Sequence, residues 1–252
     1  MEQSLAGRAA FVTGAARGFG RAFSEALCAR DARVAMADID LPAVQAAAEA
    51  IRQGGGEAMA LKCDVSDEAD VAEAMRRTKE AWGGLDILIN NAGLHSAEYA
   101  MAMITAPLAK IRRLFEVNQM GVVVCTLAAL PLMEGREGAT IVNISSSAGY
   151  PCPNAYGVSK LAVRGLTAAF ARELGKKKIR VNAIAPGLMF TDTIRNELSP
   201  EVISYVKGQQ ALDLEGEESD IVGAMLYLIS PQARFITGET IKVGGGYTLG
   251  IG

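Results

Sequence analysis

A tyrosine and a lysine stand four residues apart, at Tyr156 and Lys160, within the segment Asn-Ala-Tyr-Gly-Val-Ser-Lys at 154–160. On an α-helix this spacing places both side chains on one face, one turn apart. A free tyrosine titrates near pH ~10 and exchanges protons poorly at neutral pH. A neighbouring cation favours the phenolate and lowers its pKa toward the range of a general acid or base. The pair therefore predicts a proton-exchanging tyrosine, although a plain surface helix can show the same spacing by chance.

Short apolar runs alternate with helical segments along the chain that leads to this pair. Runs that are apolar at nearly every position predict strands of a parallel sheet covered by helices on both faces. The expected strands are 9–12, 34–37, 60–63, 86–89, 141–144, 179–184 and 240–243. The expected helices include 42–53, one capped by Ser66 that runs to about Trp82, a long apolar one at about 108–130, and 217–229.

The first of these strands is followed by a glycine-rich segment, Thr-Gly-Ala-Ala-Arg-Gly-Phe-Gly at 13–20. Gly14, Gly18 and Gly20 permit a tight turn and a close backbone approach, while the next helix leaves its first N–H groups unpaired. Such a helix start can bind a pyrophosphate, and its place between a strand and a helix favours a dinucleotide site. An ordinary structural turn would use similar residues.

The second strand ends at Asp38, about 20 residues beyond the glycines. An acid at this position would accept hydrogen bonds from the adenosine ribose and repel a 2′-phosphate, which predicts NAD rather than NADP. Arg17 argues the other way, because a cation there could meet a phosphate. Ile39 follows the aspartate where a phosphate-binding site would use arginine, so we give Asp38 more weight.

The net charge and composition of the chain argue against several other classes of function. A net charge of −3 without an extended basic tract argues against nucleic acid or an anionic membrane as the partner. The longest apolar stretch, 122–133, is too short to span a bilayer. The one histidine, His95, excludes most metal sites and every Ser–His triad, so no metal is expected. Four scattered cysteines and a start without a signal peptide predict a cytoplasmic protein.

Taken together, six motifs of the chain resemble those of the short-chain dehydrogenase/reductase family. They are Thr-Gly-x-x-x-Gly-x-Gly at 13–20, Asn-Asn-Ala-Gly at 90–93, Asn118, Ser-Ser-Ser-Ala-Gly at 145–149, Tyr156 with Lys160, and Pro186-Gly187 followed by Thr191. The resemblance covers the whole chain. It implies a single NAD-binding Rossmann domain over residues 1–252, with a seven-stranded parallel sheet and helices on both faces. It also implies a homotetramer.

The resemblance suggests a role for each catalytic position. Tyr156 would donate or accept the proton, and Lys160 would bind the nicotinamide ribose and depress the tyrosine pKa. Ser146 would hold the substrate oxygen. Asn118 would organise a water chain from Lys160 to solvent, although it could also be a core asparagine with satisfied hydrogen bonds.

The serine assignment departs from the usual family interval. The serine usually lies thirteen residues before the tyrosine, which would select Asn143. The Ser-x-Ala-Gly register instead selects Ser146, ten residues before Tyr156, and implies a loop shortened by three residues. Ser145 and Ser147 remain alternatives.

By the same resemblance a larger set of residues would contact the cofactor. They are Gly14, Arg17, Gly18, Phe19, Gly20, Asp38, Asp64, Val65, Asn91, Ala92, Gly93, Tyr156, Lys160, Pro186, Gly187, Leu188 and Thr191. Where family members usually have an aspartate after the last strand, this chain has Gly244.

An insertion at about 188–214 would form the substrate lid. Its apolar side chains suggest a hydrophobic substrate, although they could equally pack the lid onto the body or a neighbouring subunit. His95, Cys152, Met189 and Phe190 are the candidate substrate contacts, although His95 could simply be exposed.

The sequence thus predicts an NAD-dependent oxidoreductase that interconverts a secondary alcohol and a ketone on a small-to-medium hydrophobic substrate. One alternative is a 3-oxoacyl thioester reductase of fatty-acid type. Another is a dinucleotide-binding protein without catalytic activity.

Overall fold

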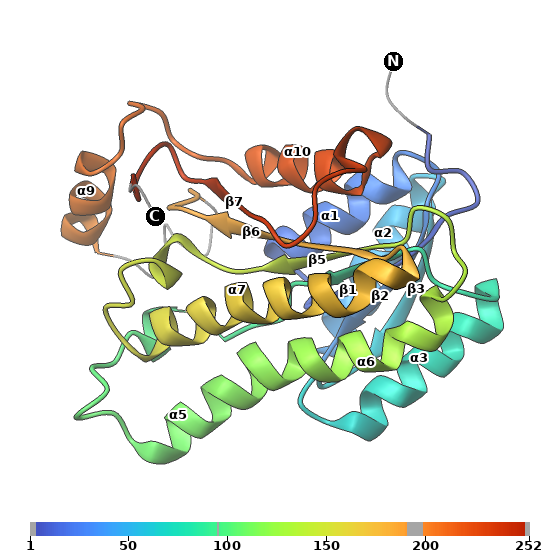
Figure 1. The fold of residues 1–252 in the computed structure, drawn as a ribbon, viewed down its shortest axis with the longest axis horizontal. Helices are drawn as coiled ribbons and strands as arrows, with labels where there is room; N and C mark the ends of the chain where they lie inside the picture. Colours follow the sequence, from blue (N-terminus) through green and yellow to red (C-terminus); the bar gives the residue numbers. More distant parts are fainter. Residues whose placement is uncertain (1–3, 95, 191–198, 250–252) are drawn as a thin grey trace.

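A computed structural model describes residues 4–94, 96–190 and 199–249 of the chain (Figure 1). Within these residues, seven parallel strands form one sheet. The strands are β1 (Ala9–Thr13), β2 (Arg33–Asp38), β3 (Glu57–Lys62), β4 (Ile87–Asn90), β5 (Thr140–Ile144), β6 (Arg180–Pro186) and β7 (Thr240–Val243). Their order is β3-β2-β1-β4-β5-β6-β7. The strand order reverses between β1 and β4, and ligands of open α/β sheets bind at the carboxyl ends of the strands beside such a reversal.

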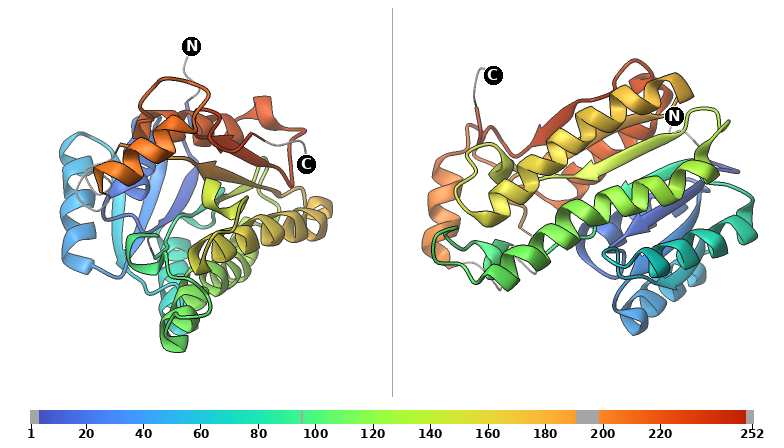
Figure 2. Two further views of the ribbon diagram at one scale, coloured as in Figure 1. Left: turned by 90° about the vertical axis from the view of Figure 1, so that its left-hand side faces the viewer. Right: turned by 60° about the horizontal axis from the view of Figure 1, so that its bottom comes forward.

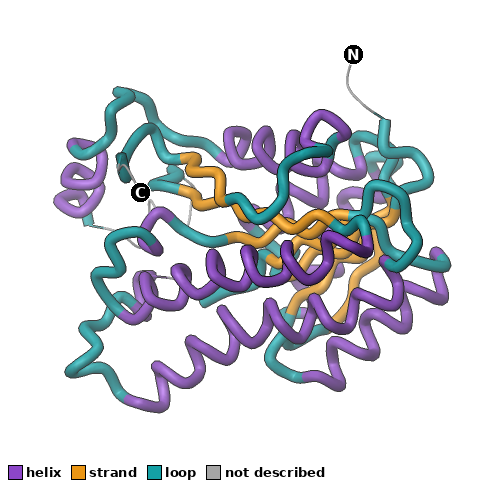
Figure 3. The backbone as a smooth tube through the Cα atoms, in the orientation of Figure 1, coloured by secondary structure: helices purple, strands orange, loops and turns teal. Residues whose placement is uncertain are grey.

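Helices cover both faces of the sheet, as Figures 2 and 3 show. The helices of the described residues are α1 (Gly18–Cys28), α2 (Leu41–Gln53), α3 (Glu68–Trp82), α4 (Ser96–Tyr99), α5 (Leu108–Phe115), α6 (Gly121–Met133), α7 (Ala155–Leu174), α9 (Pro200–Gly208) and α10 (Glu218–Ile229). The doubly covered parallel sheet expected from the sequence is confirmed.

Alternate residues of the central strands enter two separate cores. In β4, Ile87 and Ile89 pack with residues of α1, α2 and α10, whereas Leu88 packs with residues of α3, α6 and α7 on the other face. Side chains alternate across a strand, so a strand buried on both faces needs apolar residues at every position. This requirement explains the uninterrupted apolar runs in the sequence.

Helices α5 and α6 form one continuous rod, joined by a π-helical turn at Glu116–Met120. The rod, Leu108–Met133, has 26 residues, and its most apolar 18-residue window has a mean hydropathy of 1.4, so it is long and apolar enough to cross a membrane by length and composition alone. The core helix of a soluble protein meets the same criterion. Here the rod packs against α3 and α7.

The start of α3 differs from the expected one. Asp67, not Ser66, is the N-cap, and its carboxylate accepts hydrogen bonds from the backbone N–H groups of Ala69 and Asp70. Ser66 instead donates its hydroxyl hydrogen to Asp64. Both residue types can cap a helix, and the competing partner of Ser66 decides between them.

Candidate active site

The start of α7 presents Tyr156 and Lys160 on one face, as their spacing predicts. Asn154 caps the helix, and its side-chain oxygen accepts a hydrogen bond from the Gly157 N–H at 3.0 Å. The Nζ atom of Lys160 lies 5.9 Å from the centroid of the Tyr156 ring. The cap fixes the first turn, so the two side chains project from a rigid helix end.

Lys160 is buried, with 5% of its surface exposed. Its Nζ donates a hydrogen bond to the carbonyl oxygen of Ile144 at 2.9 Å. Burial disfavours the ammonium form and lowers the pKa of Lys160 to about 8. The amine therefore titrates much closer to neutral pH than an exposed lysine.

The phenol of Tyr156 is partly buried, and burial raises the pKa of Tyr156 above its ordinary value. The nearby Ser146 hydroxyl lowers this pKa and only partly offsets the effect of burial. The sequence predicts a pKa lowered by Lys160, so the direction in this structure is opposite. The Lys160 amine is itself buried, and it donates a hydrogen bond to the carbonyl oxygen of Ile144. The four-residue spacing carries no information about burial, so it could not predict the direction of the Tyr156 pKa shift.

The neighbouring serines have other partners. Ser145 is buried and donates its hydroxyl hydrogen to the carbonyl oxygen of Lys160 at 2.7 Å, and Ser147 is buried in the turn that follows. Gly149 ends that turn directly against α7, where an added Cβ would lie 2.8 Å from the carbonyl carbon of Lys160. These contacts favour Ser146 as the serine that faces Tyr156.

Asn118 lies in the π-helical turn and is buried. Its Oδ1 accepts a hydrogen bond from the Leu94 N–H at 2.7 Å, and its Nδ2 donates to the Ser159 hydroxyl at 3.0 Å. A Cβ added at Gly93 would lie 3.3 Å from both Asn118 Oδ1 and Lys160 Nζ. Asn118 therefore joins the turn after β4 to α7. Because Gly93 has no side chain, the Asn118 amide and the Lys160 Nζ can both lie close to its backbone. The role of Ser159 in this junction was not predicted from the sequence.

The glycine-rich loop fits a pyrophosphate. Helix α1 begins after Arg17, which makes no side-chain cap, and its first turn contains no acidic residue. By contrast, α2 and α3 are capped by aspartates. The unpaired N–H groups and positive dipole end of α1 are therefore left for an anion. A Cβ at Gly20 would lie 2.1 Å from the Gly14 carbonyl oxygen, so the loop can fold this tightly only with glycine there.

A set of hydrogen bonds fixes this loop to the turn after β4. The hydroxyl oxygen of Thr13 accepts hydrogen bonds from the N–H groups of Asn91 and Ala92 at 3.0 and 2.9 Å. The Asn91 amide donates to the carbonyl oxygens of Thr13 and Gly14. These bonds bridge the ends of β1 and β4, where the strand order reverses.

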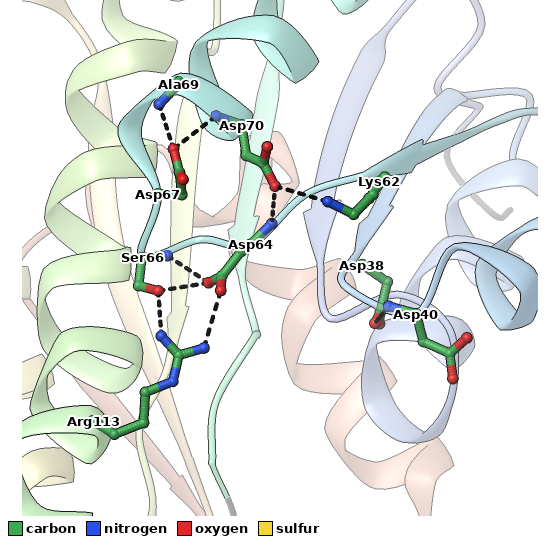
Figure 4. Close-up of polar contacts among 9 residues, drawn as sticks. All are labelled: Asp38, Asp40, Lys62, Asp64, Ser66, Asp67, Ala69, Asp70 and Arg113. Carbon is green, nitrogen blue, oxygen red and sulfur yellow. Dashed lines mark hydrogen bonds and ion pairs between the residues drawn. The ribbon is translucent and has the colours of Figure 1, made fainter. Parts of the chain in front are cut away.

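Acidic residues gather at the carboxyl ends of β2 and β3 (Figure 4). The carboxylate of Asp38 accepts hydrogen bonds from the backbone N–H groups of Ala16 and Asp40, both at 3.0 Å. It therefore lies beside the glycine-rich loop. Burial, followed by the negative charges of Asp70, Asp64, Asp38 and Asp67, raises the pKa of Cys63 to about 12. Lys62 and Arg113 form ion pairs with Asp70 and Asp64 at the same edge, so two of these four negative charges have a cationic partner.

Asp64 follows β3 and is bonded on both carboxylate oxygens. Ser66 donates from its N–H and its hydroxyl to Oδ1, and Arg113 donates to Oδ2 at 3.0 Å. Although burial opposes them, these bonds lower the pKa of Asp64. The following residue, Val65, is buried. Arg113 lies 49 residues away in the chain, so local sequence patterns did not reveal its contact.

The structure describes only part of the segment that follows β6. Leu188 and Met189 are buried, and Met189 packs within the core beside Ile184 and Ile221, which favours packing over a substrate contact. The Phe190 N–H donates to the carbonyl oxygen of Gly216 at 2.8 Å. His95 and Thr191 lie outside the described residues.

Two other positions in this region bear on the sequence predictions. Cys152 is partly buried in the loop before α7 and adopts a φ of 48°. The N–H of Gly187 donates to the Val243 carbonyl oxygen at 2.7 Å, and a Cβ at Gly244 would lie 2.9 Å from the Gly187 Cα. A side chain at position 244 would therefore require the Gly187 backbone to shift.

The family model described as enoyl-(acyl carrier protein) reductase matches residues 14–248. An uncharacterized oxidoreductase of Mycobacterium tuberculosis is 40% identical over 96% of this chain and 98% of its own length. The cis-4-hydroxycyclohexanecarboxylate dehydrogenase of Sinomonas cyclohexanicum is 34% identical over 98% of this chain and 99% of its own length. A solved 7α-hydroxysteroid dehydrogenase, complexed with NADH and 7-oxo glycochenodeoxycholic acid, is 31% identical with a TM-score of 0.91. That alignment covers 97% of this chain and 96% of the other.

Proposed function

Because the chain belongs to the short-chain dehydrogenase/reductase family, we propose that it is an NAD-dependent oxidoreductase that interconverts a secondary alcohol and a ketone. The observation that carries this proposal is the buried amine of Lys160, whose Nζ lies 5.9 Å from the centroid of the Tyr156 ring, with the Ser146 hydroxyl near the same phenol. A hydroxyl pair of this kind can hold one substrate oxygen and move one proton at it.

The dinucleotide would lie along the carboxyl ends of the strands. The uncapped start of α1 would bind its pyrophosphate, Asp38 the adenosine ribose, and Lys160 the nicotinamide ribose. When bound, the nicotinamide supplies hydride transfer. The protein must then position the substrate carbon and handle the proton.

Tyr156 exchanges that proton in our proposal. In oxidation its phenolate oxygen accepts the hydroxyl proton of the alcohol, and in reduction its phenol donates a proton to the carbonyl oxygen. Ser146 holds the same substrate oxygen by a hydrogen bond. Lys160 contributes positive charge next to the phenol, where an anionic oxygen needs it most.

We propose a preference for NAD over NADP. Asp38 places a negative charge beside the loop that would bind the pyrophosphate. A 2′-phosphate would meet this charge, whereas two ribose hydroxyls could donate hydrogen bonds to it.

For the substrate we propose a secondary alcohol on a hydrophobic ring. Two relatives are named for compounds with a hydroxyl group on a ring, namely a 7α-hydroxysteroid and cis-4-hydroxycyclohexanecarboxylate. Residues at about 188–214 would form the lid, and α9 within it carries an exposed Tyr205.

We further propose a homotetramer in the cytoplasm. β7 is an edge strand of the described sheet, and edge strands carry backbone groups that can pair with another subunit. The four cysteines are free thiols, which suits a reducing compartment.

One alternative remains within the enzyme class, because the matching family model is described as an acyl carrier protein reductase. An acyl-thioester reductase of this kind would be expected to offer a basic surface to an acidic carrier protein. It would also be expected to prefer NADPH, and Asp38 argues against that cofactor.

A substrate screen tests the proposal. The purified protein is incubated with NAD or NADP and a panel of cyclic and linear secondary alcohols, and the absorbance of the reduced cofactor is followed. The reverse reaction is run with the matching ketones and with a 3-oxoacyl thioester. Turnover of a cyclic alcohol with NAD is the expected result, whereas turnover of the thioester alone, or of none of these compounds, would contradict the proposal.

A further inference from the structure

Arg113 joins two segments that are distant in the sequence. It extends from α5 to the loop after β3, where it donates to the Ser66 hydroxyl at 2.6 Å and to Asp64 Oδ2 at 3.0 Å (Figure 4). Ser66 in turn donates twice to Asp64 Oδ1. The carboxylate is therefore fixed in position and orientation by three donors from two residues.

Stability does not account for this arrangement. The side chains of Arg113 and Asp64 are 43% and 24% exposed, and an ion pair this accessible to water contributes only about 0–1 kcal/mol to folding. The main consequence of the Arg113–Asp64 pair is that it fixes the orientation of the carboxylate. The bonds occupy both lone pairs of Oδ1 and one of Oδ2, so Oδ2 keeps one acceptor position.

The strand order indicates which ligand group could occupy the remaining acceptor position of Asp64 Oδ2. In the proposed cofactor site the pyrophosphate lies at the end of β1 and the ribose at Asp38, at the end of the adjacent β2. The base attached to that ribose would next meet the end of β3, where Asp64 stands. An adenine carries an exocyclic amino group, which is a hydrogen-bond donor, whereas a hypoxanthine carries an oxygen there.

We propose that Arg113 is a positioning residue for adenine recognition, which holds Asp64 with one acceptor position directed at the adenine amino group. This inference rests on the proposed dinucleotide site. It assigns to α5 a part in base selection, five residues before Asn118 in the same continuous rod. Without the guanidinium, the carboxylate would rotate and lose the fixed acceptor direction.

The test compares NAD with nicotinamide hypoxanthine dinucleotide, which differs at the base. Affinities are measured by calorimetry on the full chain without substrate, so the result does not depend on turnover. Wild type should prefer NAD by about tenfold, the scale of one hydrogen bond to a charged group. Arg113→Gln should abolish most of this preference by weakening NAD while leaving the hypoxanthine analogue nearly unchanged.

Arg112→Gln is the matched control, because Arg112 is exposed on the same helix and its loss removes the same charge. It should retain the preference. Ser66→Ala is a second test that leaves the Arg113 charge in place, and it should reduce the preference in part. Equal weakening of both dinucleotides by Arg113→Gln, or an unchanged preference, would overturn the proposal. Failure of the wild type to bind either dinucleotide would instead refute the proposed function.

Discussion

The Nζ atom of Lys160 is bonded to the carbonyl oxygen of Ile144, the last residue of β5, at 2.9 Å. Ser146 stands two residues beyond that carbonyl group and lies near Tyr156, which is four residues before the lysine. The end of one strand and the first turn of one helix therefore fix all three side chains relative to one another. A displacement of either element would affect the three together.

The buried ammonium should reduce the stability of the folded protein. The pKa of Lys160 is about 8 in the folded state against 10.5 for an ordinary lysine, so the unfolded chain binds more protons between these values. Stability should rise with pH across this interval, and the cost of burial is complete below pH 8. Lys160→Met should therefore stabilise the protein at pH 7 by about 2 kcal/mol, after loss of the hydrogen bond to Ile144, and the gain should shrink toward pH 10.

Urea unfolding at pH 7 and pH 10 measures this difference. The exposed Lys176→Met provides the control and should change little at either pH. A Lys160→Met protein that is less stable than wild type at pH 7 would show that burial of the ammonium is compensated elsewhere.

Asp38 should determine the choice of dinucleotide. Asp38→Asn removes the charge but keeps an oxygen that can accept the hydrogen bond from the Ala16 N–H. The ratio of kcat/KM for NAD to that for NADP should fall about tenfold, the scale of one charge-assisted hydrogen bond. Steady-state kinetics with both cofactors measure the ratio.

Asp40→Asn is the matched control for that change. Asp40 caps α2 through its side chain, and asparagine caps a helix about as well, so this variant removes one nearby charge without disturbing the fold. An equal fall in the ratio for both variants would mean that the overall negative potential, and not Asp38 itself, selects the cofactor.

Gly149 should be intolerant of any side chain. Alanine there would place a Cβ 2.8 Å from the Lys160 carbonyl carbon and 2.9 Å from the Leu161 nitrogen, both backbone atoms of α7. Gly149→Ala should destabilise the protein by about 1–3 kcal/mol and lower kcat, because the turn that carries Ser146 must move. Thermal unfolding and kinetics measure the two effects.

The opposite result is expected at Gly165, in the same helix. A Cβ there meets no atom within 4 Å, so Gly165→Ala should stabilise α7 by about 0.5–1 kcal/mol without changing kcat. Similar behaviour of the two variants would contradict the close contact assigned to Gly149.

The sequence predicts those elements of the fold that depend on the pattern of residues close together in the chain. The apolar runs locate every strand, and the glycines locate the loop before α1 because strand, turn and helix signals coincide there. The π-helical turn at Asn118 is not predicted, since apolar spacing does not reveal a change of hydrogen-bond register. The contact of Arg113 with Asp64 depends on tertiary packing. The pKa of Tyr156 depends on burial, which four-residue spacing cannot supply.

Replacement of the tyrosine tests the central claim most directly. Tyr156→Phe keeps the ring and removes only the hydroxyl group that would exchange the proton. We expect turnover of the best alcohol to fall by about 10²–10⁴-fold while the affinity for NAD, measured by calorimetry on the same preparation, stays nearly unchanged. Retained turnover, or a loss of NAD binding as large as the loss of turnover, would contradict the account.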